Sequence, residues 1–165
     1  LAGCGDGEYV ALFEKILRPI AIEFEPEIIL VSAGFDIHFN EPLGGMRVTP
    51  LGFAALTRSV LNTADVCCGG KVIMTLEGGY DLQGLRDSVR AVLRELAGLQ
   101  KTDIGGVMSG ADSEILAVLL WRVRRIHGRY WKTLQLALKN GSDPEPSFVQ
   151  RFKEKLARIT AYLRS

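Results

Sequence analysis

The sequence predicts an α/β fold in which a parallel sheet is flanked by helices. Two short apolar runs, at residues 28–31 and 71–76, have the length and composition of buried strands. The segment between them places apolar side chains at the spacing of a helix. A strand, a helix and a second strand in this order predict parallel pairing through a right-handed crossover.

Composition and charge limit the possible classes of protein. Hydrophobic residues make up 47% of the 165 residues, which suits one folded domain rather than a disordered chain. No apolar run reaches the roughly 18 residues of a membrane helix, and a net charge of +1 gives no general attraction to nucleic acid. The three cysteines, Cys4, Cys67 and Cys68, form no CxxC pair, so we expect reduced thiols in a cytoplasmic protein.

The first element should be a helix over residues 9–24, where apolar side chains recur with a helical period. Asp6 is placed to cap its N-terminus. Pro19 should kink or split this helix, because proline has no N–H to donate and its ring meets the carbonyl four residues earlier. The strand over residues 28–31 is apolar throughout, which predicts that both of its faces are covered.

A second helix should begin at Thr49, because threonine followed by proline is a typical helix start. It should end before Gly69 and Gly70. One face of this helix should be buried, and it carries Phe53, Leu56, Val60 and Ala64.

The second strand, 71–76, should lead into a helix that Asp81 caps and Gly98 closes. Two parallel strands cannot form a sheet that is covered on both faces, so we expect further strands to come from elsewhere. The chain starts at Leu1 within a loop-like segment, which favours a piece of a longer protein.

Residues 101–110 are rich in glycine and should link residues 1–100 to a helical tail at 111–165. The tail should be a hairpin of helices at 113–139 and 149–163. Its first helix carries a basic and aromatic cluster: Trp121, Arg122, Arg124, Arg125, Arg129, Tyr130, Trp131 and Lys132. Nucleic-acid binding is conceivable, but a solvated helix face fits the near-zero net charge better.

The most informative stretch is residues 31–40 (VSAGFDIHFN), where a strand runs into small residues, a carboxylate and an imidazole. Active sites of α/β proteins form at the carboxyl ends of strands. Asp36 is therefore a candidate metal ligand, with a turn or cap role as the equally weighted alternative. If the strand continues, His38 shares a face with Asp36 and the pair could share one metal. If the chain turns after Asp36, the side chains diverge and His38 is a hydrogen-bonding residue.

The second strand ends in EGGY at 77–80 and brings a phenol to the same edge of the sheet. Gly78 and Gly79 permit positive φ angles and a close approach of the backbone to a ligand. Tyr80 could donate a hydrogen bond to a developing oxyanion, or it could simply cover a turn. The glycine pair could instead cradle phosphate, but no GxGxxG or Walker pattern surrounds it, so a nucleotide-binding domain is the weakest interpretation.

Several linked motifs resemble the histone deacetylase superfamily, which includes bacterial deacetylase-like proteins and acetylpolyamine amidohydrolases. They are VSAGFDIH at 31–38, EPLGG at 41–45, TPLGFA at 49–54 and LEGGY at 76–80, with GCGDGEY at 3–9 also fitting. The resemblance covers about residues 1–98 and keeps the family's motif order. It implies the arginase–deacetylase fold, of which residues 1–100 would be the C-terminal part of the catalytic domain.

The resemblance also implies a zinc hydrolase that acts on acetylated lysine or acetylated polyamines. Asp36 matches the last of the family's zinc ligands, and Tyr80 matches its oxyanion-stabilising tyrosine. Zinc would polarise the acetyl carbonyl and lower the pKa of a bound water toward about 7. Hydrogen bonding from the phenol would then stabilise the tetrahedral oxyanion.

Neighbouring positions match in the same way. Leu43 matches a wall residue of the family's acyl-lysine tunnel, and Gly78 and Gly79 match the loop beside that tunnel. His38 is common in the motif, but the resemblance does not make it a ligand. Glu41 stands where the family usually has aspartate, so we expect it to support the site or the fold.

One departure from the family is large. Its adjacent catalytic histidines and its Asp-x-His ligand pair have no counterpart, because the chain contains only His38 and His127. A catalytic zinc needs about three protein ligands, so we expect the isolated 165 residues to be inactive and to bind zinc poorly. The alternative to a partial deacetylase is a non-catalytic remnant that serves as a binding or scaffold module through its helical tail.

Overall fold

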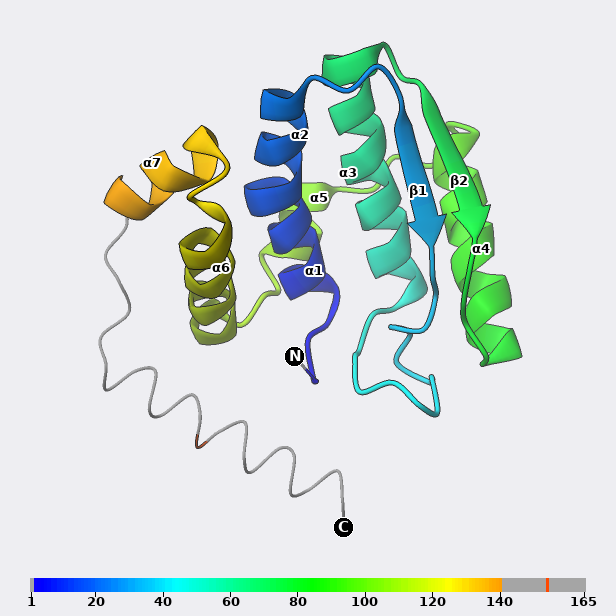
Figure 1. Ribbon diagram of the computed structural model, residues 1–165. Helices are drawn as coiled ribbons and strands as arrows, with labels where there is room; N and C mark the ends of the chain where they lie inside the picture. The colour runs from blue at the N-terminus through cyan, green and yellow to red at the C-terminus, as the bar shows by residue number, and fades with distance from the viewer. Residues whose placement is uncertain (1, 141–153, 155–165) are drawn as a thin grey trace.

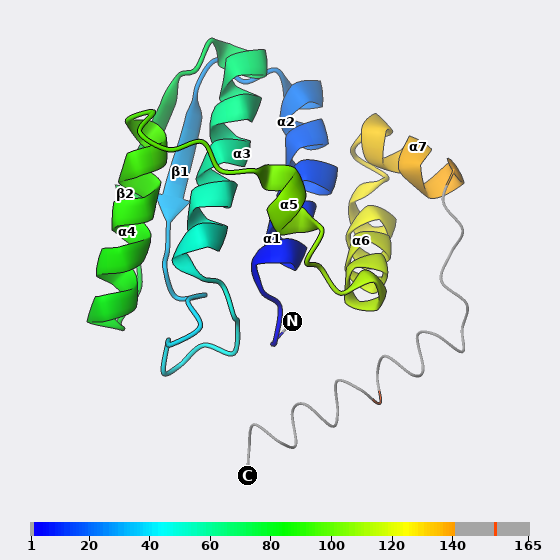
Figure 2. The same ribbon diagram turned by 180° about the vertical axis from the view of Figure 1, so that it is seen from behind.

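The computed structural model describes residues 2–140 and residue 154. Its strands β1 (Ile29–Ala33) and β2 (Val72–Leu76) pair in parallel, with Ile29 opposite Val72 and Ala33 opposite Leu76. Helix α3 (Pro50–Cys68) joins them and lies behind the sheet in Figure 1 and in front of it in Figure 2, so the crossover is right-handed. The predicted strand, helix, strand unit is confirmed.

The predicted break in the first helix is a single wide turn. The run consists of α1 (Asp6–Leu12), the π-helical turn η1 (Phe13–Leu17) and α2 (Arg18–Phe24). The N–H of Arg18 donates to the carbonyl of Phe13, five residues back. This wide turn ends at Leu17, two residues before Pro19, which has no N–H and whose ring would meet a carbonyl in a regular α-helix. The proline is thus accommodated without ending the helical run.

The start of this run differs from the prediction that Asp6 caps it. Gly5 is the N-cap and Asp6 is the first helical residue. The Asp6 carboxylate instead accepts hydrogen bonds from the backbone N–H and the hydroxyl of Thr49, both at 2.7 Å. Thr49 caps α3 as predicted, since its hydroxyl accepts from the N–H of Gly52. Asp6 therefore joins the starts of two helices that are distant in the sequence.

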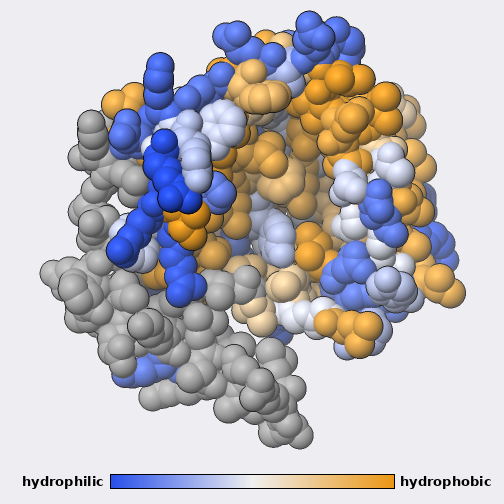
Figure 3. Space-filling model, viewed as in Figure 1, coloured by the Kyte–Doolittle hydropathy of each residue, from blue (hydrophilic) through white to orange (hydrophobic). Residues whose placement is uncertain are grey.

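The sheet is covered on one face. Figure 2 shows α3 and α4 (Leu82–Leu96) side by side against the same face of the strands. On the other face the cross-strand pair Leu30 and Ile73 is 70% and 54% exposed, and Figure 3 shows hydrophobic atoms gathered over the strands. The prediction that both faces of the first strand are covered is wrong for the described chain, because none of its helices lies against this second face.

Side chains between the sheet and the helices form the core. The predicted inner face of α3 is buried at Phe53, Leu56, Val60 and Ala64. Phe53 packs with Phe35 and Val48 under the sheet, while Leu56 packs with Val10 of α1. Asp81 caps α4 as predicted, because its carboxylate accepts from the N–H of Gly84. The core therefore fixes α3 between α1 and the strands.

The segment expected to be a linker, residues 101–110, contains a short helix, α5 (Ile104–Met108). Glycines at 105 and 106 weaken its helical propensity. Ile104, Val107 and Met108, at helical spacing, nevertheless pack against Val10 and its neighbours in the core. Tertiary packing thus outweighs local propensity in this segment.

The long helix predicted at 113–139 is divided into α6 (Ser113–His127) and α7 (Lys132–Asn140). Helix α6 ends at its C-cap, Gly128. Glu23 of α2 accepts hydrogen bonds from the backbone N–H groups of Lys132 and Thr133, both at 2.9 Å, and so caps the start of α7. The predicted partner helix at 149–163 lies outside the described residues apart from residue 154. No helix in the described part of the chain is long and apolar enough to cross a membrane.

Candidate active site at the carboxyl ends of the strands

Two loops meet where the parallel strands end. Beyond β1 and β2 the pairing continues, since the carbonyl of Ala33 accepts from the N–H of Glu77 at 3.0 Å and the carbonyl of Gly78 accepts from the N–H of Phe35 at 2.9 Å. Figure 1 shows both loops below the arrowheads of the strands. The segments that carry Asp36 and Tyr80 are therefore held at the same end of the sheet, where α/β proteins place their sites.

Asp36 is exposed and its carboxylate lies against the backbone of Gly78. A Cβ atom built on Gly78 would lie 2.8 Å from Asp36 Cγ and would overlap its Oδ2. With glycine here, the backbone of the loop can lie directly against the Asp36 carboxylate. Within residues 2–140 nothing donates a hydrogen bond to the Asp36 carboxylate, so its oxygens are available to a ligand.

His38 is buried, whereas Asp36 is exposed. The chain turns after Asp36, and the N–H of His38 donates to the carbonyl of Phe35 at 3.0 Å. The imidazole is 3% exposed, its Nδ1 accepts from the N–H of Asn40 at 3.2 Å, and the ring stacks on Phe53 with centroids 6.5 Å apart. The second alternative thus applies, and His38 is a hydrogen-bonded core residue.

Glu41 holds the loop that follows β2, residues 77–81, called the second loop below. Its side chain is 6% exposed, and its Oε1 accepts from the N–H of Tyr80 at 2.6 Å and from the N–H of Asp81 at 3.2 Å. Its Oε2 lies 3.2 Å from the same two nitrogen atoms. The sequence carries no local signal for this contact, because the partners are 39 and 40 residues apart.

Tyr80 and Leu43 lie on an open surface, with exposed fractions of 70% and 88%. Gly79 has a φ angle of +121°, and a Cβ atom there would lie 2.8 Å from Cβ of Phe35. Gly79 thus adopts the positive φ that glycine permits. Around Leu43 the described residues do not form an enclosed tunnel.

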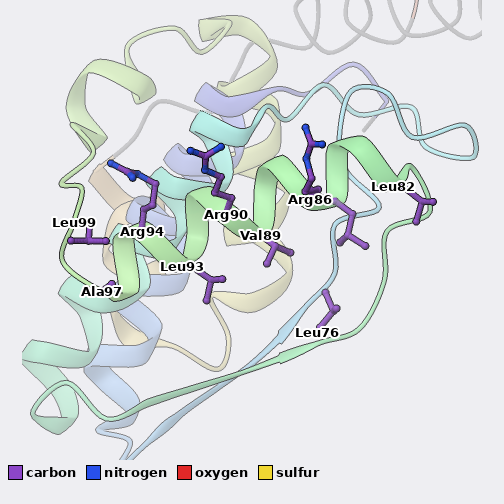
Figure 4. A pocket seen from close by; sticks show the side chains of 10 residues that line it. Leu76, Leu82, Arg86, Val89, Arg90, Leu93, Arg94, Ala97 and Leu99 are labelled. Carbon is purple, nitrogen blue, oxygen red and sulfur yellow. The ribbon is translucent and has the colours of Figure 1, made fainter.

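Two hollows lie near these loops, and neither is lined by Asp36, Glu41 or Tyr80. One is a groove between β2 and α4, shown in Figure 4 with Leu76, Val89 and Leu93 on one side of the helix and a row of arginines on the other. The second lies under the inner face of the sheet and is lined mainly by apolar side chains of β1, β2 and α3. The candidate site residues thus lie outside both of these hollows.

The donor set fits part of a zinc site. Asp36 offers a carboxylate without a hydrogen-bond donor, and carboxylate oxygen is an accepted zinc ligand. Across the described ranges, no group of three or more His, Cys, Asp or Glu side chains could hold a metal ion. Cys4 is buried, and burial raises the pKa of its thiol, so the thiol remains protonated at neutral pH. Asp36 could therefore supply one ligand, with the others required from outside this set.

Comparison with known proteins identifies relatives of the whole described unit. A family model for the histone deacetylase domain matches residues 1–96. Histone deacetylase 18 of Arabidopsis thaliana is 34% identical over 99% of the chain, and polyamine deacetylase HDAC10 of Homo sapiens is 39% identical over 81% of it. The chain spans 23% and 19% of the length of these two relatives, about a fifth in each case.

Solved structures agree with this assignment. A structure of the histone deacetylase Clr3 superposes with a TM-score of 0.70 at 33% identity, covering 81% of this chain and 21% of that one. The HD domain of HDA15 superposes with a TM-score of 0.67 at 30% identity, covering 84% of this chain and 35% of that one. The parallel sheet and its helices are therefore part of an arginase–deacetylase fold. With a match that extends over residues 1–96, this chain belongs to the histone deacetylase family.

Proposed function

We propose that these residues supply one metal ligand and the oxyanion donor of a zinc-dependent deacetylase site. The carrying observation is that Asp36 and the loop of Tyr80 lie at the same end of one parallel sheet, with the carboxylate against Gly78. The remaining ligands and the general base would come from residues outside this chain, which contains only two histidines.

Each residue has a separate role in this proposal. Asp36 would hold zinc through its free carboxylate. When bound, zinc would polarise the acetyl carbonyl and lower the pKa of a water ligand toward about 7. The Tyr80 phenol would donate a hydrogen bond to the oxygen of the former carbonyl as negative charge develops on it. Leu43, Gly78 and Gly79 would form the part of the acyl channel that these loops contribute.

The substrate class would be an acetylated amine, either acetyl-lysine in a protein or an acetylated polyamine. Support comes from the names of the relatives, which include both histone deacetylases and a polyamine deacetylase. In both substrates a narrow alkyl chain ends in the same acetamide, so the chemistry proposed for Tyr80 applies to either. Parallel assays with an acetyl-lysine peptide and with acetylspermidine would distinguish them.

Two substitutions test the roles in the complete gene product that carries these residues. Tyr80→Phe should lower turnover by about 10²–10³-fold, because one oxyanion donor is lost, while zinc content measured by mass spectrometry stays the same. Asp36→Ala should instead lower zinc content. Unchanged turnover in the first variant, or full zinc in the second, would remove that residue from the site.

The isolated chain provides a further control. The purified 165 residues should hold clearly less than one zinc ion per molecule and release no acetate from either substrate. Tight binding of one zinc ion per molecule in this preparation would contradict the proposal that the remaining zinc ligands come from outside this chain. An inactive complete gene product would instead favour a binding module.

A further inference from the structure

We infer that Glu41 is a positioning residue, which fixes the backbone of Tyr80 relative to Asp36 and thereby places the phenol for catalysis. This inference rests on the proposed function. It makes the expected supporting role of Glu41 specific, because the folded chain shows which backbone groups its buried carboxylate holds.

The contact between Glu41 and the second loop satisfies two backbone groups. The N–H groups of Tyr80 and Asp81 come just before α4, where the helix offers them no acceptor. Both carboxylate oxygens of Glu41 lie within 2.6–3.2 Å of these nitrogen atoms. Hydrogen bonds from N–H groups to an ionised, buried carboxylate are stronger than those to a neutral acceptor.

The loop of Tyr80 depends on this contact. Gly78 and Gly79 precede the tyrosine and allow many backbone conformations. The Tyr80 side chain is 70% exposed and makes no hydrogen bond within residues 2–140. The carbonyl of Gly78 is held by the N–H of Phe35. In the described residues from Gly79 to Asp81, the N–H groups that form hydrogen bonds are those of Tyr80 and Asp81, and both donate to Glu41. Removing the carboxylate would therefore release the phenol rather than the whole sheet.

On its other side, Glu41 is joined rigidly to Asp36. Consecutive turns link them, because the N–H of His38 donates to the carbonyl of Phe35 and the N–H of Glu41 donates to the carbonyl of His38, each at 3.0 Å. The buried His38 ring anchors the middle of this segment. Asp36 and Glu41 thus lie in one segment whose backbone is fixed by these turns. Because Glu41 also holds the backbone of Tyr80, it sets the spacing between Asp36 and Tyr80.

The decisive experiment compares Glu41→Gln with Glu27→Gln in the complete gene product. The amide introduced by Glu41→Gln keeps one oxygen acceptor but turns an NH₂ group toward backbone N–H donors. We expect kcat to fall by about 10–100-fold, the effect of misplacing a reacting group by roughly an ångström, with KM and zinc content unchanged. Glu41→Asp retains the charge and should recover part of the loss. Glu27 is exposed and precedes β1 at the opposite end of the sheet, so Glu27→Gln should leave kcat unchanged.

An independent readout uses the 165-residue chain. In its NMR spectrum the amide protons of Tyr80 and Asp81 should shift upfield in Glu41→Gln, while signals from the core of α3 remain. Unchanged shifts at both amides, unchanged kcat, or a loss of zinc and of fold in parallel with activity would overturn the inference. If Tyr80→Phe retains full turnover, the proposed function itself fails; if Tyr80→Phe is inactive and Glu41→Gln is fully active, the positioning role alone fails.

Discussion

Single residues in the Tyr80 loop differ in what their side chains would meet. A side chain at Gly78 would collide with the end of the Asp36 side chain, which is short, exposed and able to rotate. One at Gly79 would collide with Cβ of buried Phe35 and would also have to adopt a φ angle of +121°. The two adjacent glycines therefore serve different purposes, the first for the position of a carboxylate and the second for the conformation of the chain.

Alanine at each glycine should separate these purposes. Gly79→Ala should lower the free energy of unfolding by about 1–3 kcal/mol, because a strained backbone conformation is forced on alanine. Gly78→Ala should lower it by less than about 1 kcal/mol, because the Asp36 side chain can swing aside. Urea unfolding of the 165-residue chain measures both values. Equal losses in the two variants would contradict this distinction.

Between elements, a buried ion pair fixes α4 against α3 and the segment that follows α4. Glu95 is 1% exposed and accepts from Nε of Arg58 at 2.8 Å, while Nη2 of Arg58 donates to the carbonyl of Gln100 at 2.9 Å. The other Glu95 oxygen accepts from the N–H of Thr102 at 2.8 Å and from its hydroxyl. Both oxygens of the buried carboxylate thus have partners, as a buried charge requires.

Glu95→Ala should destabilise the protein by about 3–5 kcal/mol, because Arg58 then loses its counter-charge in a largely buried position. The matched control is Asp87→Asn on the same helix, which removes the exposed pair with Arg86. That change should leave the free energy of unfolding nearly unchanged, because solvent screens the pair. Thermal or urea unfolding compares the two, and a similar loss in both would refute the importance of burial.

These elements also show what sequence could and could not predict. The Thr49 and Asp81 side chains each accept from an N–H group three residues further along the chain, so a local pattern was sufficient to predict both caps. Glu23 and Glu41 accept from N–H groups that are 109 and 39 residues away, and the sequence around each glutamate gives no sign of these partners. Asp36 and Tyr80 could be proposed as site residues because strand ends and family motifs are local signals, whereas the contacts of Glu41 are visible only in the folded chain.

For the molecule as a whole, Glu23 joins the N-terminal helices to the tail. It accepts from the N–H groups of Lys132 and Thr133, and from the Thr133 hydroxyl at 2.8 Å. Nearby, Trp131 meets Phe24 edge to face, and Leu134 is buried with Ile16 and Leu120. Polar and apolar contacts therefore both hold α7 against α2.

This junction should depend on pH. The backbone N–H groups of Thr133 and Lys132 hold the pKa of Glu23 below its ordinary value. A lowered pKa in the folded state means that the stabilisation is complete above the ordinary glutamate pKa of about 4.3 and is lost as pH falls through the lower folded value. Amide NMR shifts of Lys132 and Thr133 should report this loss between about pH 5 and pH 3. Glu23→Gln should remove the dependence and Glu25→Gln, at a neighbouring exposed position, should retain it.

The sheet in the described chain has two strands, so each strand keeps one side on which its backbone N–H and C=O groups have no ladder partner. These unpaired strand edges, together with the apolar surface at Leu30 and Ile73, form a template to which a strand of another molecule can pair. Preparations of this chain will therefore be prone to concentration-dependent aggregation that begins at β1 or β2, and a charged residue introduced on either strand should raise the concentration that remains in solution.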